Sequence, residues 1–229
     1  MNLNIVRLGN MEYQNALDIQ ERLLKMRQEG HIGDTLLLVA HPPVLTIGRR
    51  GSDMNIRVSR EWLASKGVSV YPVSRGGDVT YHGPGQIVGY PIMDLTGHGR
   101  DIRDFVAKVK DVFIRLLAEE YGIEATGGDQ KYTGVFVGDQ KITAIGIAVR
   151  RWVTMHGFAF NVNTDLSHFD WIVPCGLADK GVTSLEKLLG EPQDFDRMNE
   201  IVAGYFCKVF GMEGQRTDLP ALLAEGGAL

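Results

Sequence analysis

Apolar residues recur with a helical period in three long segments of this chain. These segments cover residues 11–29, 101–121 and 194–210. In the second segment, Phe105 and Phe113 belong to one apolar stripe that would face a core. Glycines follow the first and second segments and would end those helices. We therefore predict three amphipathic helices, each buried along one face.

Shorter apolar or alternating runs between these helices predict β-strands. The runs lie at 36–40, 44–47, 68–73 and 87–93, and three successive strands fill 131–162. Gly138-Asp139 would form the first turn of that last group, and the second turn would lie near Arg150-Arg151. Because strands follow one another locally rather than alternating with helices, we predict an α+β fold in one domain, 1–229. Its sheet would be mixed and largely antiparallel, with flanking helices.

Two short helices are predicted from residues that would cap their first turns. Ser59 would cap a helix that ends near Gly67. Thr183 and Glu186 have the spacing of a capping box, in which two side chains and two backbone amides bond reciprocally. The preceding segment, 163–181, has no regular pattern.

The composition excludes several classes of protein. The 229 residues include 24 basic and 28 acidic side chains, and the net charge of −4 disfavours nucleic-acid binding through bulk charge. Hydrophobic residues make up 44% of the chain, too many for a mainly disordered protein. Two cysteines cannot build a disulfide framework or a cysteine-rich zinc site. The sequence contains no secretion signal or membrane-spanning run, so we expect a cytoplasmic protein with no membrane or nucleic-acid partner.

A glycine-rich block at 75–86 is the first candidate for a functional site. Its glycines would let the backbone pass close to a ligand. Arg75 could bind an anionic group, and His82 could act as an acid, a base or a hydrogen-bond partner. A tight turn beside a buried histidine would explain the glycines alone. The gathering of arginine, tyrosine, histidine and four glycines within this block favours a site.

Cys175 and Lys141 are the second and third candidates. Cys175 stands between proline and glycine in the irregular segment, where a cysteine can be a nucleophile, although most cysteines are buried apolar residues. Cys207 lies within a predicted helix and is interpreted as structural. Lys141 opens an apolar strand, where desolvation would lower its pKa. Taken alone, a solvated lysine just past a turn is the simpler interpretation.

The fourth candidate is the segment 156–163, in which small residues and two asparagines follow His156. Small residues in a strand indicate that something packs closely on the backbone, or that the sheet bends there. His156 and the other histidines lack the short spacing of metal ligands, so no metal is expected. The phosphate-binding loops of nucleotide-binding proteins are absent from the sequence.

Together these segments resemble the lipoyl(octanoyl) transferase family of bacterial lipoate biosynthesis. The matching segments, in the family's order, are 75–91 (RGGDVTYHGPGQIVGYP), 141–146 (KITAIG), 156–163 (HGFAFNVN) and 174–177 (PCGL). The resemblance implies a fold like the catalytic domain of lipoate and biotin protein ligases. It also implies that octanoyl-acyl carrier protein donates an octanoyl group to a lysine of lipoyl domains, as in the E2 components of 2-oxoacid dehydrogenases and the glycine cleavage H protein. No cofactor is implied, and we expect a monomer.

The same resemblance assigns roles by position. Cys175 would hold the acyl group as a thioester, and Lys141 would be its partner. The substrate site would be lined by Arg75, Gly76, Gly77, Asp78, Val79, Thr80, Tyr81, His82, Ala144, Ile145, Gly146, Gly157, Phe158 and Ala159. A larger residue at Gly157 would then shift the preferred acyl chain toward shorter lengths.

Three other functions remain open from the sequence. An ATP-dependent lipoate ligase would share the glycine-rich block but would need no Cys175, because it activates a free acid. A non-catalytic binder of acyl carrier protein or lipoyl domains would need neither Cys175 nor Lys141. A cysteine hydrolase would use His82 as its base and would have to admit water. The pair Cys175 and Lys141 favours the transferase, whose thioester donor is already activated and needs no ATP.

Overall fold

The three long helices are present where the apolar periodicity predicts them. The structure, a computed structural model, describes residues 1–128, 133–173 and 181–225. The helices are α1 (Tyr13–Gln28), α3 (Ile102–Tyr121) and α5 (Phe195–Phe210). The Asp101 and Asp194 side chains accept backbone N–H groups at the starts of α3 and α5, and left-handed glycines end both helices. Local sequence alone therefore accounts for their boundaries.

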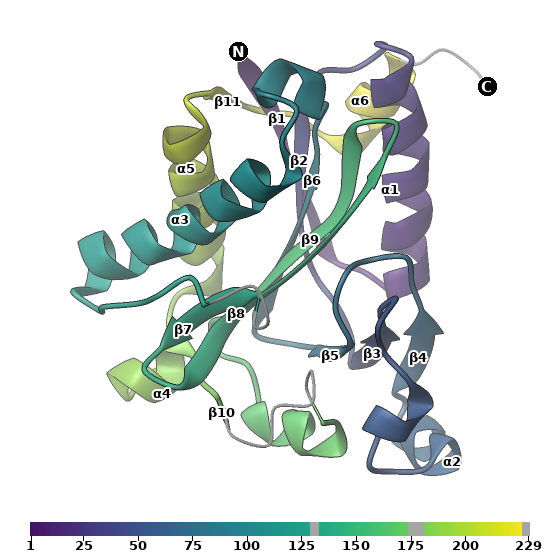
Figure 1. Cartoon of the computed structure of the whole chain (residues 1–229), viewed down its shortest axis with the longest axis vertical. Coiled ribbons are helices and arrows are strands. Elements are labelled where there is room, and N and C mark those ends of the chain that lie inside the picture. Colours follow the sequence, from purple (N-terminus) through teal and green to yellow (C-terminus); the bar gives the residue numbers. More distant parts are fainter. Residues whose placement is uncertain (129–132, 174–180, 226–229) are drawn as a thin grey trace.

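A large mixed sheet forms the centre of the molecule (Figure 1). In the described chain its strand order is β10-β8-β9-β6-β2-β1-β11, and β7 also pairs with β8. The strands are β1 (Asn2–Asn10), β2 (Thr35–Ala40), β6 (Gln86–Ile92), β7 (Gly134–Val137), β8 (Gln140–Arg150), β9 (Val153–Asn161), β10 (Gly181–Val182) and β11 (Glu213–Arg216). The central pairs are antiparallel, whereas β1 pairs in parallel with β2 and β11, and β10 in parallel with β8. The prediction of a mixed, largely antiparallel sheet is confirmed.

Two-residue turns connect the predicted hairpins. Gly138 and Asp139 join β7 to β8, as expected. Arg151 and Trp152, both with positive φ, join β8 to β9, one residue beyond the predicted position. Long unbroken pairing of β8 with β9 follows, because these turns set the register.

A second, three-stranded sheet stands beside the large one. Its strands are β3 (Val44–Ile47), β4 (Ser69–Pro72) and β5 (Val79–His82), and β3 lies between the other two. Helix α2 (Arg60–Ser65) follows Ser59, whose side chain caps it as predicted. Strand β5 was not predicted, because it lies inside the glycine-rich block, where turn-forming residues mask a four-residue strand.

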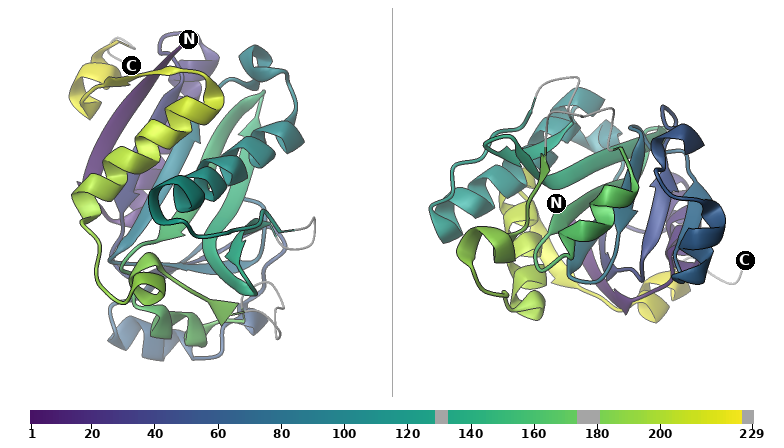
Figure 2. Two further views of the ribbon diagram at one scale, coloured as in Figure 1. Left: turned by 90° about the vertical axis from the view of Figure 1, so that its left-hand side faces the viewer. Right: turned by 90° about the horizontal axis from the view of Figure 1, so that it is seen from below.

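Helices cover both faces of the large sheet (Figures 1 and 2). Side chains of α3 and α5 share one core with Leu36 and Leu38 of β2. Leu37 and Val39, which point to the opposite face, share a second core with α1 and α6 (Leu219–Ala224). The uninterrupted apolar run of β2 is thus explained by burial on both sides.

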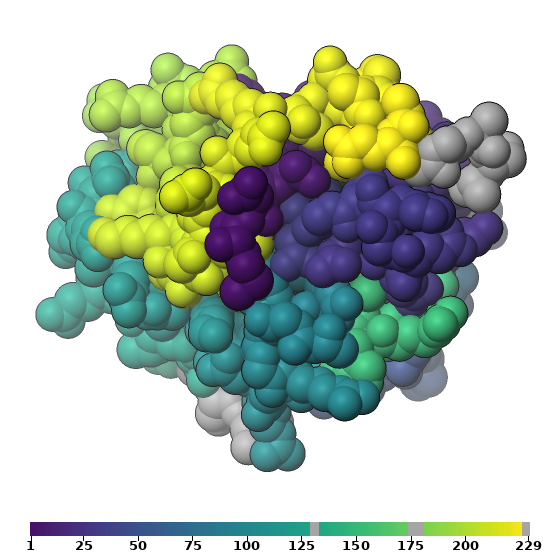
Figure 3. Space-filling view, turned by 90° about the horizontal axis from the view of Figure 1, so that it is seen from above, coloured from purple at the N-terminus to yellow at the C-terminus, as the bar shows by residue number. Residues whose placement is uncertain are grey.

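The remaining elements are short. They are α4 (Leu185–Leu189) and the 3₁₀ helices η1 (Asp53–Asn55), η2 (Leu95–His98) and η3 (Leu166–Trp171). The Ser184 side chain caps α4, whereas the Thr183 N–H bonds to the Lys141 carbonyl. The predicted capping box was therefore wrong by one residue, because Thr183 extends the strand pairing of β10. Figure 3 shows the C-terminal segment lying against the N-terminal strand. None of the helices in the described ranges is long and apolar enough to cross a bilayer.

Asp34 joins three elements at one end of the large sheet. Its carboxylate accepts hydrogen bonds from Arg27 Nε (2.8 Å), His98 Nε2 (2.6 Å) and the Asp94 N–H (3.0 Å). These residues belong to α1, to η2 and to the segment after β6. Burial would raise the pKa of Asp34, but the bonds from His98, Asp94 and Arg27 outweigh it and hold the pKa below the ordinary value.

We expect Asp34→Asn to lower the free energy of unfolding by about 3 kcal/mol, because buried donors lose a charged acceptor. The matched variant Asp111→Asn, which removes a more exposed ion pair with Arg115, should cost under about 1 kcal/mol. The Asp34 contribution is complete above its ordinary pKa of 3.8 and is lost as pH falls through the lower folded-state value. Urea unfolding between neutral pH and pH 3 measures both effects, and equal costs for the two variants would contradict the assignment.

Candidate active site

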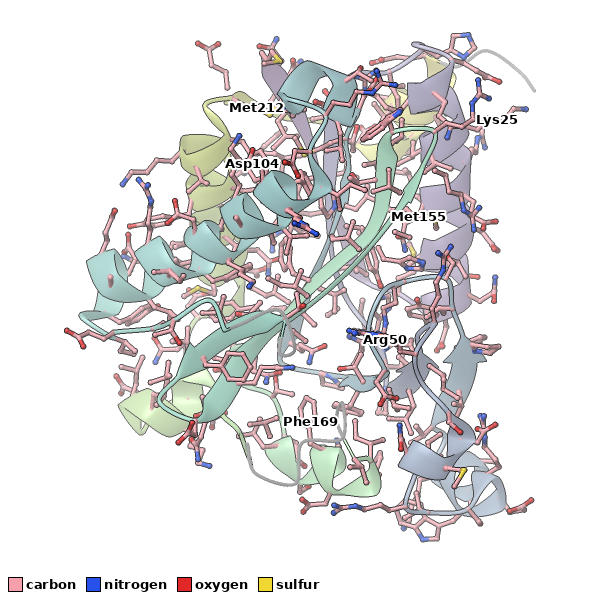
Figure 4. The ribbon with its side chains drawn as sticks, in the orientation of Figure 1. Lys25, Arg50, Asp104, Met155, Phe169 and Met212 are labelled. Atoms are coloured by element: carbon pink, nitrogen blue, oxygen red, sulfur yellow. The ribbon has the colours of Figure 1, made fainter. Side chains whose placement is uncertain are left out.

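A cavity of about 760 Å³ lies between the large sheet, the small sheet and helix α3. Its walls include the centre of the β8–β9 ladder, strand β5 and the 75–78 loop. In Figure 4, Arg50 lies between the β8–β9 ladder and the small sheet, and Phe169 of η3 lies below them; both residues belong to the wall. The size is typical of a pocket for a small molecule.

The cavity brings together residues that are far apart in the sequence. Lys141 and all the predicted substrate-site residues except Tyr81 line it. Tyr81 packs behind the wall instead, where its hydroxyl bonds to His168 Nδ1 (2.7 Å) and its ring contacts Phe169 and Trp171. Cys175 lies outside the described residues.

The Arg75 side chain is held firmly against the small sheet. Its guanidinium donates to the Thr46 carbonyl (2.7 Å), to the Thr46 hydroxyl (2.9 Å from Nη2) and to the Gly76 carbonyl (3.0 Å). Only 8% of Arg75 is exposed. Its positive charge therefore acts on the cavity from a fixed position. Burial is the main cause that lowers the pKa values of His82 and His156, and this charge lowers both further.

Glycines allow the 75–77 loop to lie directly on strand β8. The Gly76 N–H donates to the Ile147 carbonyl (3.1 Å). A Cβ on Gly146 would approach the Gly76 carbonyl oxygen to 2.8 Å and the Arg75 Cδ to 3.1 Å. A Cβ on Gly48 would meet the Gly77 oxygen at 2.5 Å. These glycines therefore bring backbone to backbone, which places Arg75 at the cavity wall.

Strand β9 is irregular at His156, where the sequence left a bend and a site as alternatives, and His156 and Gly157 line the cavity. His156 has a φ of +55°, and its N–H donates to Gln20 of α1 (2.9 Å). Next to it, a Cβ on Gly157 would lie 1.9 Å from the Gly89 carbonyl oxygen of β6. A larger residue at Gly157 would therefore collide with β6, and the expected shift toward shorter acyl chains does not follow.

A wall of aromatic residues that the sequence analysis did not assign to the site closes one side of the cavity. The His41 Nδ1–H donates to the Met11 carbonyl (2.7 Å), so His41 Nε2 accepts from the Tyr90 hydroxyl (2.8 Å). Tyr13 stacks on His82 with 6.1 Å between ring centroids. Burial lowers the pKa of His41 to about 4, and burial with the neighbouring His41 lowers that of His82 to about 3.

Lys141 lies in β8, beside the first strand that follows Cys175 in the sequence. Lys141 pairs with Val182 of β10, and its carbonyl accepts the Thr183 N–H (3.0 Å). Its Nζ lies 5.3 Å from the centroid of the Phe136 ring. A Cβ on Gly134 of β7 would approach the Lys141 Cε to 3.2 Å, so the glycine leaves room for the lysine side chain.

Positive charge predominates around the cavity. Its described lining includes one carboxylate, Asp78, and five basic side chains: Arg50, Arg75, Arg103, Lys110 and Lys141. Asp78 itself accepts bonds from the Asn55 amide (2.7 Å) and the Val79 N–H (2.6 Å). Among the described residues no cluster of histidine, cysteine, aspartate and glutamate could hold a metal. The field of this wall favours an anion or a developing negative charge.

Residues 12–207 match the family described as the lipoyl protein ligase A/B catalytic domain. This chain belongs to that family. An octanoyltransferase from Caldicellulosiruptor saccharolyticus is 62% identical over 211 residues, covering 92% of this chain and 90% of that protein. An octanoyltransferase from Desulforamulus reducens is 54% identical over 218 residues, covering 95% of each. The resemblance found in the sequence is confirmed.

Solved structures confirm the predicted ligase-like fold. Lipoate-protein ligase A bound with ATP superimposes with a TM-score of 0.81 at 16% identity, over 98% of this chain and 94% of that chain. The apo biotin protein ligase from Aquifex aeolicus gives a TM-score of 0.52 at 12% identity, over 92% of this chain and 69% of that chain. At these identities the likeness concerns the fold alone.

We expect Gly146→Ala to push the 75–77 loop away from β8. Such overpacking should cost about 1–3 kcal/mol of folding free energy. The displaced loop should slow octanoyl transfer by up to about 100-fold. Gly204→Ala in α5, where a Cβ meets nothing within 4 Å, should leave activity unchanged and stabilise the helix by about 0.5–1 kcal/mol. Thermal unfolding and transfer rates measure both, and a fully active Gly146→Ala protein would show that this contact does not position the loop.

Proposed function

We propose that this protein transfers an octanoyl group from octanoyl-acyl carrier protein to a lysine of lipoyl domains, through a thioester on Cys175. The observation that carries the proposal is the position of Lys141. It lies in the cavity wall and pairs with β10. Gly181, the first residue of β10, follows Cys175 by six positions in the sequence and also lines the cavity. The relatives from Caldicellulosiruptor saccharolyticus and Desulforamulus reducens are octanoyltransferases, which supports the same activity.

The cavity offers an apolar surface for an acyl chain. Val88, Ile145, Phe158 and Ala159 line it, and all four side chains are buried in the sheet. Burying a methylene contributes about 0.8 kcal/mol, so an octanoyl chain would gain roughly 5 kcal/mol from full burial. Close packing around these walls would resist longer chains more sharply than shorter ones.

In the first half-reaction the Cys175 thiolate attacks the carbonyl carbon of the donor thioester. A new carbon–sulfur bond forms, the bond to the carrier sulfur breaks, and the carrier leaves as a thiolate that takes up a proton from the Lys141 ammonium, which becomes neutral. An ordinary cysteine has a pKa of about 8.5 and is mostly thiol at neutral pH. The ammonium group of Lys141 and the fixed charge of Arg75 would stabilise the thiolate.

In the second half-reaction the lysine amine of the lipoyl domain attacks the acyl-enzyme. A carbon–nitrogen bond forms, the bond to Cys175 breaks, and the amine loses a proton. Lys141 in its neutral form can accept that proton, which returns it to the ammonium state and regenerates the Cys175 thiolate beside it. The conversion of a thioester to an amide makes this step favourable, so no nucleotide is needed.

Burial of His82 and the neighbouring His41, which lower the pKa of His82, argue against a hydrolase that would use His82 as its base. With a pKa of about 3, His82 is a weak proton acceptor at neutral pH. An ATP-dependent ligase shares this fold, but its chemistry would give Cys175 no role, because it activates a free acid. Incubation with octanoyl-acyl carrier protein separates these functions, because only the transferase forms a stable acyl-enzyme without nucleotide.

We expect intact-protein mass spectrometry to detect one octanoyl adduct after incubation with octanoyl-acyl carrier protein and no ATP. Hydroxylamine should remove the adduct, because it cleaves thioesters. Cys175→Ala should lose both the adduct and the transfer. Cys207→Ala should keep both, since Cys207 is partly buried in α5 and burial raises the pKa of its thiol. If Cys175→Ala still transfers octanoate, the covalent route is excluded.

We expect Lys141→Arg to slow transfer by about 10²–10⁴-fold, because guanidinium cannot exchange a proton at these pH values. The variant should remain folded, since the side chain is only half-buried. Lys108→Arg on α3, whose side chain pairs with Asp104 (2.9 Å), is the matched control and should retain activity. Single-turnover rates for each half-reaction provide the measurement. Normal turnover in Lys141→Arg would restrict Lys141 to an electrostatic role.

A further inference from the structure

A chain of buried hydrogen bonds connects His82 to the backbone of Thr183. His82 Nδ1 lies 2.8 Å from Gln86 Oε1. The Gln86 amide nitrogen lies 2.9 Å from Asn161 Oδ1, and the Asn161 amide nitrogen lies 3.0 Å from the Thr183 carbonyl oxygen. Gln86 and Asn161 face each other across the β6–β9 ladder and are 1% and 4% exposed. Water therefore does not compete for these bonds.

Two backbone carbonyls beside this series of hydrogen bonds determine which group donates and which accepts in each bond. The Thr183 carbonyl can only accept, so Asn161 must present its NH₂ group there and its oxygen to Gln86. The Gln86 NH₂ group then donates to Asn161 Oδ1 and also lies 3.3 Å from the Tyr81 carbonyl. The Gln86 oxygen is left for His82, and an oxygen requires a donor. The proton of the His82 ring therefore resides on Nδ1.

We infer that Gln86 and Asn161 are positioning residues that hold His82 in the Nδ1–H tautomer, so that its Nε2 lone pair accepts an N–H group of the substrate. His82 lines the cavity, and no residue in the described ranges bonds to its Nε2. Stacking against Tyr13, with an angle of 7° between the rings, and an edge contact with His41 keep the imidazole plane fixed. The inference relies on the proposed function only for the identity of that N–H group.

The same threonine connects this chain of hydrogen bonds to Lys141. The Thr183 N–H donates to the Lys141 carbonyl (3.0 Å), while its carbonyl accepts from Asn161. The backbone of Thr183 therefore helps to fix both the position of Lys141 in its strand and the position of the proton on the His82 ring. A neutral acceptor is useful in a wall rich in cations, because an N–H group finds few lone pairs there.

The tautomer is tested directly by nitrogen-15 NMR of protein labelled at histidine. In the unmodified protein, His82 should carry its proton on Nδ1 and none on Nε2 throughout the neutral range. Asn161→Leu leaves the Gln86 NH₂ group without this acceptor and should give a mixture of tautomers. Asn199→Leu removes another buried amide, which bonds within α5 (2.8 Å), and should leave the His82 signals unchanged. An Nε2–H tautomer in the unmodified protein would overturn the inference.

Kinetic measurements show which N–H group of the substrate donates a hydrogen bond to His82 Nε2. Asn161→Leu should slow one half-reaction by about ten- to a hundredfold, the loss expected for one buried hydrogen bond. Slower acylation of Cys175 would identify an amide N–H of the donor arm, and slower transfer from the acyl-enzyme would identify the lysine amine. If the tautomer changes and both rates stay normal, Nε2 accepts nothing from the substrate and the inference fails.

Gln86→Glu adds a readout that a purely structural role would not give. The carboxylate still accepts from His82 Nδ1–H, but its negative charge raises the pKa of the imidazole. As pH falls, Nε2 should gain a proton and become a donor, so activity should acquire a new acid limb near neutral pH. A profile identical to that of the unmodified protein would contradict the role of Nε2. If the unmodified protein transferred no octanoate, the proposed function would fail while the NMR result still stood.

Discussion

The close contact between the 75–77 loop and strand β8 is the constraint on which the site depends. The loop hydrogen-bonds to β8 through Gly76, and Gly146 leaves no space between the two backbones for a side chain. This contact sets the position of Arg75, whose guanidinium donates to Thr46 of the small sheet and to the Gly76 carbonyl of the loop. The contact therefore helps to fix the separation between the small sheet and the large sheet, and with it the shape of the cavity between them.

Electrostatics divide the cavity between charged and neutral groups. Five basic side chains line it beside one carboxylate that is already bonded to Asn55 and Val79. Burial lowers the pKa values of His41, His82 and His156 in this wall, and the charge of Arg75 lowers those of His82 and His156 further, so protonation is disfavoured. The site thus combines a field suited to a thiolate or an oxyanion with imidazole lone pairs suited to N–H groups.

The fold also explains how ligases and transferases can share one architecture. A TM-score of 0.81 at 16% identity means that the sheet and its helices persist while most side chains differ. What decides the chemistry is the set of groups presented to the cavity. In this chain Lys141 comes from a strand that pairs with β10, which follows Cys175 closely in the sequence, and the proposed mechanism assigns its roles to these two residues.

Local sequence determined the long helices, the β7–β8 and β8–β9 hairpins and the residues of the glycine-rich block, because capping residues, turn glycines and periodic burial act over a few positions. The tertiary structure alone decided the rest. Strand β11 is exposed and polar throughout, so only its pairing with β1 makes it a strand. Tyr13 lies in a predicted helix and Tyr90 in a predicted strand, and both reach the cavity because Tyr13 of α1 stacks on His82 and Tyr90 of β6 donates to His41. Thr183 resembled a helix cap until its pairing with Lys141 took its N–H, since a backbone amide serves one long-range partner at a time.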